Sequence, residues 1–467
     1  MEKKEIRVGI VGNVDVGKTS LISVLTNNIL DNGRGSARRL VMKHPHEVDS
    51  GRTSSVTLNF MRTFFNTPEE LNTISSTPIL SSDTKHTKSQ NNIHLSKHKS
   101  NDNNINEKED TTINNGLETE GNKNYKYEKV INLIDLAGHE KYLKTTIRGI
   151  NGCLVDYVCV LVGSNSGVQR MTKEHLGVAL ALKKPIIIII TKLDMAPKNV
   201  LDETLRNVKK LFKKRNIKTI NMIDNNDIKI MKEFYKSGNY KSIVPIFKLS
   251  SVSGKGLPLF KQFIFHLDPY IDYTEKQTDK PHFIIESTYQ IKGIGIVLSG
   301  TMKDGIIYKG ETLKLGPYKG EFIDIIVKSI HNNFREDVSS LSAGEGGCFS
   351  IKLAPASVNK KVELKRNLIK KGMRIMKDIQ FYYEFEAEVL ILHHPTTIKA
   401  NYQPTIHCGT ITQTAKICSM EKELMRTGDR SKIKFRFMYR PEYLETNNYL
   451  VFREGSTKGI GKIINVF

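Results

Sequence analysis

The segment Gly12–Thr19, with the sequence GNVDVGKT, constrains the fold of this chain more than any other feature. It fits the pattern GxxxxGK(S/T), follows the strand-like run Ile6–Val11 and opens the helix-like stretch Lys18–Leu30. A glycine-rich turn there lets backbone N–H groups and a helix N-terminus surround phosphate groups. We therefore predict an α/β domain in which Lys18 faces the β- and γ-phosphates and Thr19 offers a hydroxyl to Mg²⁺. The predicted phosphate-binding residues are Gly12, Asn13, Val14, Asp15, Val16, Gly17, Lys18, Thr19 and Ser20.

The sequence DLAGH, residues 135–139, ends the apolar run VINLID. Asp135 at the end of that strand can reach a bound metal through a water molecule. The N–H group of Gly138 can contact a γ-phosphate. Both residues therefore belong to the predicted nucleotide site, because open α/β sheets bind ligands at the carboxyl ends of their strands.

Two further segments predict recognition of guanine. Residues 191–194, Thr-Lys-Leu-Asp, end a run of five isoleucines, and a carboxylate at Asp194 can accept hydrogen bonds from guanine N1 and N2. Adenine cannot supply those two donors, so the wrong base leaves a polar site unpaired. Residues 250–252, Ser-Ser-Val, end another strand and suit a contact to guanine O6. The predicted base-site residues are Thr191, Lys192, Asp194, Ser250, Ser251 and Val252.

Two kinds of pattern divide the 467 residues, which are too many for one hydrophobic core. Residues 1–275 alternate strand-like and helix-like stretches, which indicates a largely parallel sheet. After Pro281, short strands punctuated by glycines replace the helical pattern, which is typical of small β-barrels. We expect an α/β P-loop G domain, residues 1–275, followed by two small antiparallel β-barrels, residues 280–378 and 380–467.

Residues 66–125 interrupt the first domain with a segment rich in Asn, Ser, Thr and Lys. Such a segment cannot bury enough apolar surface to offset its ordering entropy, so we predict a long disordered insert. The strand-like run Val56–Phe65 leads into it, which indicates that the insert lengthens a hairpin of the G domain. Residues 66–128 hold 7 basic and 10 acidic side chains, so the formal charge of +22 arises from the rest of the chain.

The composition narrows the class of protein. A charge of +22 favours an anionic partner such as RNA. The five cysteines form no CxxC pair, which argues against a disulfide framework or zinc site and indicates a reducing compartment. No apolar run approaches the roughly 18 residues of a membrane span, and the first residues lead directly into a strand, leaving no room for a targeting peptide. We expect a cytoplasmic monomer without a membrane partner.

Three other patterns need interpretation. Gly293–Gly300 superficially matches a dinucleotide loop, but its spacing is wrong and no helix follows, so we predict barrel turns. His393 and His394 suggest a metal site, but no Cys or acidic residue lies at ligand spacing. Lys360–Lys377 carries eight basic residues and one acid, and it is either a solvated face or an RNA contact.

The phosphate loop, DLAGH, TKLD and SSV, followed by two barrels, resemble the translational GTPases of the elongation factor Tu/1-alpha superfamily. Further motifs are similar to those of the GTP-binding protein 1/2 group within it. Those motifs are His46–Val56, Glu384–Glu388, Leu392–Thr397, His407–Gly409, Arg426–Asp429, Pro441–Leu444 and Val451–Gly455. The resemblance covers nearly the whole chain except the insert.

The resemblance implies a Mg²⁺-dependent GTPase that converts GTP to GDP and phosphate. Thr19 and Ser55, the latter in the first switch segment, would ligate Mg²⁺, with Asp135 acting through water. His139 would orient the attacking water once the ribosome is engaged. Its place directly after Gly138 agrees with that role, and the sequence has no evident arginine finger.

The chain departs from the superfamily at three positions. Thr191 stands where the base-binding motif usually has Asn, so the tie between base and phosphate loop rests on a shorter side chain. Ser54 occupies a position that usually holds an apolar residue, and that apolar residue helps to screen the attacking water. Ser55 stands where most elongation factors have Thr, and its hydroxyl can still ligate Mg²⁺.

The sequence is compatible with three functions. The first is a GTPase that acts with the ribosome and (aminoacyl-)tRNA in elongation or rescue. The second is a GTP-dependent RNA-binding adaptor in mRNA turnover or surveillance. The third is a regulatory GTPase with a protein effector, which the two barrels argue against because such barrels dock tRNA and the ribosome in the factors that the chain resembles.

Overall fold

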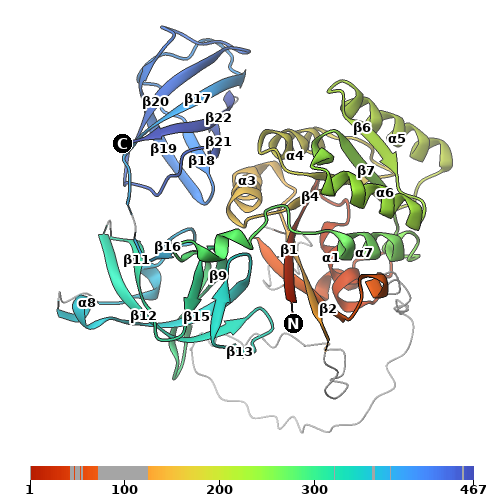
Figure 1. Ribbon diagram of the computed structural model, residues 1–467. Coiled ribbons are helices and arrows are strands. Elements are labelled where there is room, and N and C mark those ends of the chain that lie inside the picture. The colour runs from red at the N-terminus through yellow and green to blue at the C-terminus, as the bar shows by residue number, and fades with distance from the viewer. Residues whose placement is uncertain are drawn as a thin grey trace, which may run out of the picture.

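The computed structural model describes residues 2–42, 47, 53, 56–71, 125–319, 321–359, 363–378, 380–454 and 457–467. Along the chain, an α/β domain is followed by two antiparallel barrels, here domains II and III, which lie on one side of it (Figure 1). The predicted fold class is confirmed.

The G domain is built on a seven-stranded sheet with the order β2-β3-β1-β4-β5-β7-β6. Adjacent strands are parallel except for the pair β2 and β3. The central strands are buried on both faces, which explains their continuous apolar runs. The strands are β1 (Glu2–Gly12), β2 (Thr57–Phe65), β3 (Tyr127–Asp135), β4 (Tyr157–Gly163), β5 (Ile186–Thr191), β6 (Lys218–Asn221) and β7 (Ile243–Lys248).

Helices cover both faces of this sheet. One core is formed by α1 (Lys18–Asn27), α6 (Asn225–Lys236) and α7 (Leu257–His266) against alternate strand residues. The other core is formed on the opposite face by the remaining helices. Because successive strand residues point to opposite faces, Ile187 and Ile189 enter the first core and Ile188 enters the second. The helices of the second core are α3 (Leu143–Gly152), α4 (Arg170–Ala181) and α5 (Lys198–Lys213).

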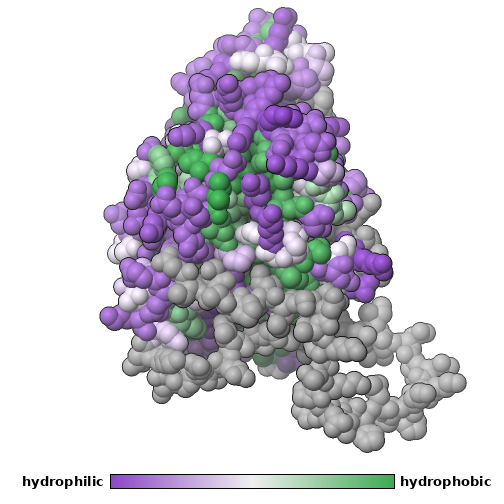
Figure 2. Space-filling model, turned by 90° about the vertical axis from the view of Figure 1, so that its right-hand side faces the viewer, coloured by the Kyte–Doolittle hydropathy of each residue, from purple (hydrophilic) through white to green (hydrophobic). Residues whose placement is uncertain are grey.

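Helix α5 illustrates why the outer face of this domain is hydrophilic. Thr204, Val208 and Phe212, spaced four residues apart, are buried, whereas lysines such as Lys209 and Lys213 are exposed. The side of the molecule that carries α5 and α6 is accordingly mainly hydrophilic, with apolar side chains gathered toward its centre (Figure 2).

The predicted insert leaves and re-enters the G domain at one end of the β2–β3 hairpin, where Phe65 pairs with Tyr127. Residues 66–71 belong to the folded domain, because Leu71 is buried against the core that contains α1. The predicted disorder falls on residues 72–124, which lie outside the described residues.

Domain II is a closed barrel with the strand order β11-β16-β8-β9-β15-β12, in which β12 pairs back to β11. Gly293–Gly300 lies in the turn and following strand of its β8–β9 hairpin, as predicted. The strands are β8 (His282–Ile291), β9 (Gly295–Asp304), β11 (Thr312–Tyr318), β12 (Glu321–Asn332), β15 (Gly346–Leu353) and β16 (Arg374–Met376). Smaller elements are β10 (Ile306–Tyr308), β13 (Asp337–Val338), β14 (Ser340–Ser342) and α8 (Pro355–Asn359).

Domain III is a second closed barrel, with the strand order β17-β20-β19-β18-β21-β22. Its strands alternate buried and exposed residues, and phenylalanines such as Phe385, Phe435 and Phe452 fill the interior. The strands are β17 (Glu384–His393), β18 (Thr405–Cys408), β19 (Ile411–Met420), β20 (Arg430–Phe437), β21 (Tyr449–Glu454) and β22 (Thr457–Val466).

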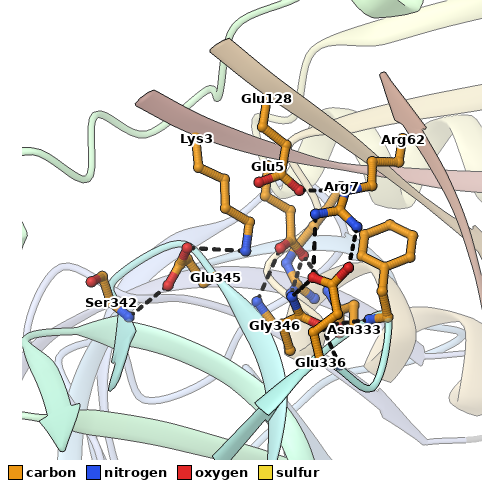
Figure 3. Close-up of polar contacts among 12 residues, drawn as sticks. Lys3, Glu5, Arg7, Arg62, Glu128, Asn333, Glu336, Ser342, Glu345 and Gly346 are labelled. Atoms are coloured by element: carbon orange, nitrogen blue, oxygen red, sulfur yellow. Dashed lines mark hydrogen bonds and ion pairs between the residues drawn. The ribbon is translucent and has the colours of Figure 1, made fainter. Parts of the chain in front are cut away.

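Buried charges join the G domain to domain II (Figure 3). Arg7 of β1 lies 3.0 Å from Glu5 and 3.5 Å from Glu286 of β8, and all three side chains are at least nine-tenths buried. Glu5 also accepts hydrogen bonds from Asn333 and from the Gly346 N–H. Each buried charge therefore has a partner on the other domain or on its own strand, as burial of charge requires.

Arg62 of β2 makes a second link to domain II (Figure 3). Its guanidinium lies 2.7 Å from Glu128 and 2.6 Å from Glu336, and 4.5 Å from the ring centroids of both Phe64 and Phe334. A guanidinium between two aromatic faces adds a cation–π attraction to the ion pairs.

Domain III contacts the G domain through α3 and α4. Glu174 of α4 pairs with Arg453 and Lys458 of domain III. At the end of α3, a Cβ on Gly152 would lie 2.9 Å from the Thr410 methyl group, and the Thr410 hydroxyl donates to the Gly372 carbonyl of domain II. The three domains therefore meet at Thr410. Within the described residues, no helix has the length and apolar character needed to cross a membrane.

Candidate nucleotide-binding site

The parallel register brings the predicted segments to one edge of the G-domain sheet. Asp135 ends β3 beside Ile10 of β1, Thr191 ends β5 beside Gly163, and residues 250–252 follow β7. A cavity at this edge is lined by residues of the phosphate loop, of the segment after β3 and of two further loops. Its lining residues are Val14, Asp15, Gly17, Lys18, Thr19, Ser20, Arg38, Thr53, Gly138 and His139.

The phosphate loop runs from β1 into α1, which begins at Lys18. Asp15 and Gly17 have φ values of 60° and 86°, in the left-handed region, so the chain turns tightly there. The Lys18 ammonium is buried and donates to the Asn13 carbonyl at 2.8 Å. Burial lowers the pKa of Lys18, and the nearby charges of Asp135 and Asp15 oppose that shift. The loop therefore presents a partly uncompensated cation to its cavity.

Gly138 packs directly on this loop. A Cβ at Gly138 would lie 2.5 Å from the Gly12 carbonyl oxygen, 2.5 Å from Lys18 Nζ and 2.8 Å from the Asn13 carbonyl carbon. No other residue type fits without moving the loop. The segment after β3 is thus in backbone contact with the predicted phosphate site.

The residues predicted for Mg²⁺ form a hydroxyl and carboxylate cluster. Thr19 Oγ1 donates to Asp135 Oδ2 at 2.6 Å, and Thr53 Oγ1 lies 2.9 Å from Thr19 Oγ1 and 3.2 Å from Asp135 Oδ2. Thr53 is a residue that the sequence analysis missed, and the predicted ligand Ser55 lies outside the described residues.

This cluster fits a hard divalent cation. Asp135 is buried, and within the described residues its Oδ1 has no hydrogen-bond partner. Burial raises the pKa of the Asp135 carboxyl, while Lys18, Thr19 and Thr53 oppose the shift. Carboxylate and hydroxyl oxygens, with water, are the ligands that Mg²⁺ prefers, so its charge would compensate the buried carboxylate.

The predicted base-site residues also come together. Ser250 Oγ donates to Asp194 Oδ1 and accepts from the N–H groups of Val252 and Ser253. The hydroxyl thus holds one carboxylate oxygen of the exposed Asp194 in place. A base that binds here would meet a carboxylate oriented by the loop that follows β7.

The structure places the Thr191 side chain against the phosphate loop. Its buried Oγ1 donates to the Val16 carbonyl oxygen at 2.7 Å, across 175 residues of sequence. The tie between base site and phosphate loop is therefore present with Thr, although the side chain is shorter than that of Asn. The following residue, Lys192, has a φ of 59° and turns the chain toward Asp194.

His139 is exposed at the mouth of the cavity and begins η3 (Glu140–Tyr142), a 3₁₀ helix. Its Nδ1 accepts the Lys141 N–H at 3.1 Å. A neutral ring that accepts at Nδ1 carries its proton at Nε2. In this arrangement His139 can donate a hydrogen bond from Nε2 to a water or phosphate oxygen.

The basic segment Lys360–Lys377 is partly structural. Arg374 is buried, lies against the His282 ring nitrogen and packs over the Tyr443 ring at 4.8 Å, between domains II and III. Arg374 is therefore not accessible to solvent or to RNA, whereas Lys370 and Lys371 are exposed.

His393 ends β17 and His394 follows it. His394 Nδ1 accepts from the Thr396 N–H. Across the part of the chain that the structure describes, neither His393 nor His394 belongs to a group of residues able to hold a metal ion.

The comparisons with known proteins agree with the fold. Residues 3–328 match the family of the elongation factor Tu GTP binding domain, and residues 384–453 match the GTP-eEF1A C-terminal domain-like family. GTP-binding protein 1 of Xenopus laevis is 41% identical over 467 residues, which is 98% of this chain and 63% of that protein. The chain thus spans less than two thirds of that relative.

Two further relatives extend the comparison. GTP-binding protein 2 of Homo sapiens is 33% identical over 473 residues, covering 99% of this chain and 69% of that protein. The structure of translation elongation factor SelB from Methanococcus maripaludis with the GTP analogue GPPNHP has a TM-score of 0.62 and 18% identity, over 100% of this chain and 80% of that one. On these matches, the chain belongs to the translational GTPases of the elongation factor Tu family and is related within it to GTP-binding proteins 1 and 2.

Proposed function

We propose that this chain binds GTP with Mg²⁺, hydrolyses it to GDP and phosphate, and acts with the ribosome and (aminoacyl-)tRNA in elongation or rescue. The observation that carries the proposal is the cluster of Lys18, Thr19 and Gly138 around one cavity, with Asp135 hydrogen-bonded to Thr19. That cluster combines a cation, a hydroxyl, a buried carboxylate and a backbone N–H, which together suit a nucleoside triphosphate and its metal.

When bound, Mg²⁺ would supply positive charge that offsets the negative charge of the phosphates. The Thr19 hydroxyl would hold it directly, with Ser55 as a second ligand and Asp135 acting through water. Lys18 exchanges its contact with the Asn13 carbonyl for phosphate oxygens. The N–H groups of residues 12–20 bind the remaining phosphate oxygens at the start of α1.

Guanine recognition rests on Asp194. One of its carboxylate oxygens already has a donor in Ser250, which fixes the plane of the carboxylate. The carboxylate then accepts from guanine N1 and N2, and the loop of Ser250, Ser251 and Val252 contacts O6. Thr191 ties the strand that leads to Asp194 to the phosphate loop through the Val16 carbonyl, and Lys192 is the neighbouring residue of the proposed base site.

Hydrolysis needs a water aligned with the γ-phosphorus. His139 follows the glycine that contacts the phosphate loop and presents Nε2–H. Donation from Nε2 to the water or to a γ-phosphate oxygen positions the nucleophile, and engagement of the ribosome brings the exposed ring into line.

The same segment links the nucleotide to the barrels. Gly138 is followed by η3 and then by α3, whose end packs on Thr410 of domain III. A γ-phosphate that shifts Gly138 therefore shifts the helix that contacts domain III. This coupling supports a protein that presents different surfaces in its GTP and GDP states.

RNA is the partner that the charge favours, and the cytoplasm is where charged tRNA and ribosomes are found. The folded part of the chain carries the excess of basic residues, which suits phosphate contacts. A GTP-dependent RNA-binding adaptor in mRNA turnover or surveillance is the alternative that the RNA-binding experiment below tests.

Replacing the base-site carboxylate should change nucleotide specificity. In Asp194→Asn, the amide cannot accept from both guanine N1 and N2 but can donate to O2 of xanthine. We expect GTP affinity to fall on the order of 10²- to 10⁴-fold, since hydrogen bonds to a charged group contribute about 1.5–3 kcal/mol each. Xanthosine triphosphate should bind more tightly than GTP. Titration calorimetry with both nucleotides measures this, and unchanged GTP affinity would refute the base-site assignment.

His139→Ala should separate binding from hydrolysis. GTP affinity should stay within about twofold, because the ground state does not need the water aligned. Ribosome-stimulated single-turnover hydrolysis should fall by about 100-fold or more. Lys141→Ala is a matched control, since its side chain is exposed while its backbone N–H still binds Nδ1. Equal stimulated rates in His139→Ala and the parent would remove His139 from the mechanism.

The delivery function predicts that RNA binding depends on the nucleotide. Aminoacyl-tRNA should bind much more tightly with a non-hydrolysable GTP analogue than with GDP. Affinity should fall steeply with salt, because each neutralised phosphate makes the slope of log affinity against log salt more negative, by about 0.9 on B-DNA and about 0.7 on single strands. Filter binding of charged and uncharged tRNA at two salt concentrations measures both. RNA binding that ignores nucleotide and aminoacyl group would contradict delivery and favour the adaptor.

A further inference from the structure

An arginine from outside every recognised motif reaches the nucleotide cavity. Arg38 lies in η1 (Ala37–Leu40), a short 3₁₀ helix in the loop after α1. It lines the same cavity as Lys18, Thr19, Gly138 and His139. Besides Lys18 and His139, the cavity therefore contains a third basic side chain, which the sequence analysis did not place there.

Hydrogen bonds to one buried side chain, that of Asp31, fix the loop that carries Arg38. The buried Asp31 carboxylate accepts from the N–H groups of Gly35 at 3.2 Å and Ala37 at 2.9 Å, and from the Ser36 hydroxyl. These bonds fold residues 31–37 around one side chain. Arg38 follows directly, so its backbone position is set by a buried carboxylate.

Two further bonds tie this loop to both ends of the predicted nucleotide. The Asp31 N–H donates to the Ser251 carbonyl, in the segment predicted to contact guanine, at 2.9 Å. Ser23 of α1, one turn beyond Thr19, donates from its buried hydroxyl to the Ala37 carbonyl at 2.6 Å. The loop is therefore held between the base segment and the helix that begins the phosphate site.

The path of the Arg38 side chain depends on the residue that it crosses. It passes over Gly35, where a Cβ would lie 2.6 Å from Arg38 Nε and 2.9 Å from Cζ. Gly35 has a φ of 84°, which favours glycine. A side chain at position 35 would push the guanidinium off its path, whereas glycine allows it to cross toward the cavity.

We propose that Arg38 is an arginine finger supplied in cis, which contacts the phosphates of bound GTP and stabilises the charge that develops during hydrolysis. This inference rests on the proposed GTPase function. In the reaction the water oxygen forms a bond to the γ-phosphorus, and the bond from that phosphorus to the β–γ bridging oxygen breaks. The electron pair stays on the β-phosphate of GDP, and the water proton ends on the released phosphate.

Arg38 suits that task chemically. The planar guanidinium can donate two parallel hydrogen bonds to phosphate oxygens, which a lysine ammonium cannot reproduce. Because a preformed loop holds the guanidinium, the side chain does not need to move when negative charge develops on the β–γ bridging oxygen. Arginine fingers in other GTPases increase kcat by about 10³- to 10⁵-fold.

The test compares Arg38→Ala and Arg38→Lys with Arg39→Ala, whose side chain is exposed and does not line the cavity. Single-turnover hydrolysis of preloaded GTP is measured with and without ribosomes, and GDP affinity is measured by calorimetry. Affinity for GDP with aluminium fluoride, which mimics the transferring phosphoryl group, gives a readout independent of turnover. Gly35→Ala, checked for folding by circular dichroism, displaces the guanidinium without removing it.

We expect Arg38→Ala and Arg38→Lys to lose hydrolysis by about 100-fold or more and to lose aluminium fluoride binding, with GDP affinity changed by less than about threefold. Gly35→Ala should lose part of both, and Arg39→Ala should match the parent. An unchanged rate of hydrolysis in Arg38→Ala would overturn the inference about Arg38 and leave the proposed function standing. Equal losses of affinity for GDP and for GDP with aluminium fluoride would do the same. A parent that hydrolyses no GTP with ribosomes would overturn the proposed function as well.

Discussion

The backbone contact between Gly138 and the phosphate loop is the constraint on which this arrangement depends. A single methyl group at that position would overlap the Gly12 carbonyl and the Lys18 ammonium. The parallel register of β1 and β3 brings the two segments together, and Thr19 and Asp135 reinforce the contact through their side chains. The chain that follows this contact leads through η3 into α3.

The domains are joined by contacts of a different kind. Arg7, Glu5 and Glu286 are buried ions whose partners lie on the G domain and domain II. Burial raises the pKa of Glu286, and Arg7 opposes that shift. Removing one partner of such a group is expected to cost about 3–5 kcal/mol, because the remaining charge stays buried without compensation. These ions specify one docking of the two domains, whereas domain III packs apolar side chains such as Val451 against the G-domain core that contains α3 and α4.

Much of the fold and part of the site could be predicted from sequence, because local patterns carry them. The phosphate loop, Asp135 and the base segment each follow an apolar strand, and parallel strands end at one edge of a sheet. Arg38 and Thr53 were not found in this way, since Arg38 belongs to no motif, Thr53 was not singled out within the motif His46–Val56, and both line the cavity from loops. Contacts such as Arg7 with Glu286 and Thr191 with Val16 join residues more than 170 positions apart, and no spacing rule encodes them.

Hydrogen exchange of the intact chain with GDP and with a non-hydrolysable GTP analogue tests the central coupling most directly. Exchange reports local opening of the backbone, so it follows each segment separately. The coupling predicts protection of residues 12–20 by both nucleotides, and a difference between the nucleotides that extends through α3 to the β18–β19 turn around Thr410. Identical exchange of α3 and of that turn in both states, with residues 12–20 protected, would show that the phosphate site does not communicate with domain III.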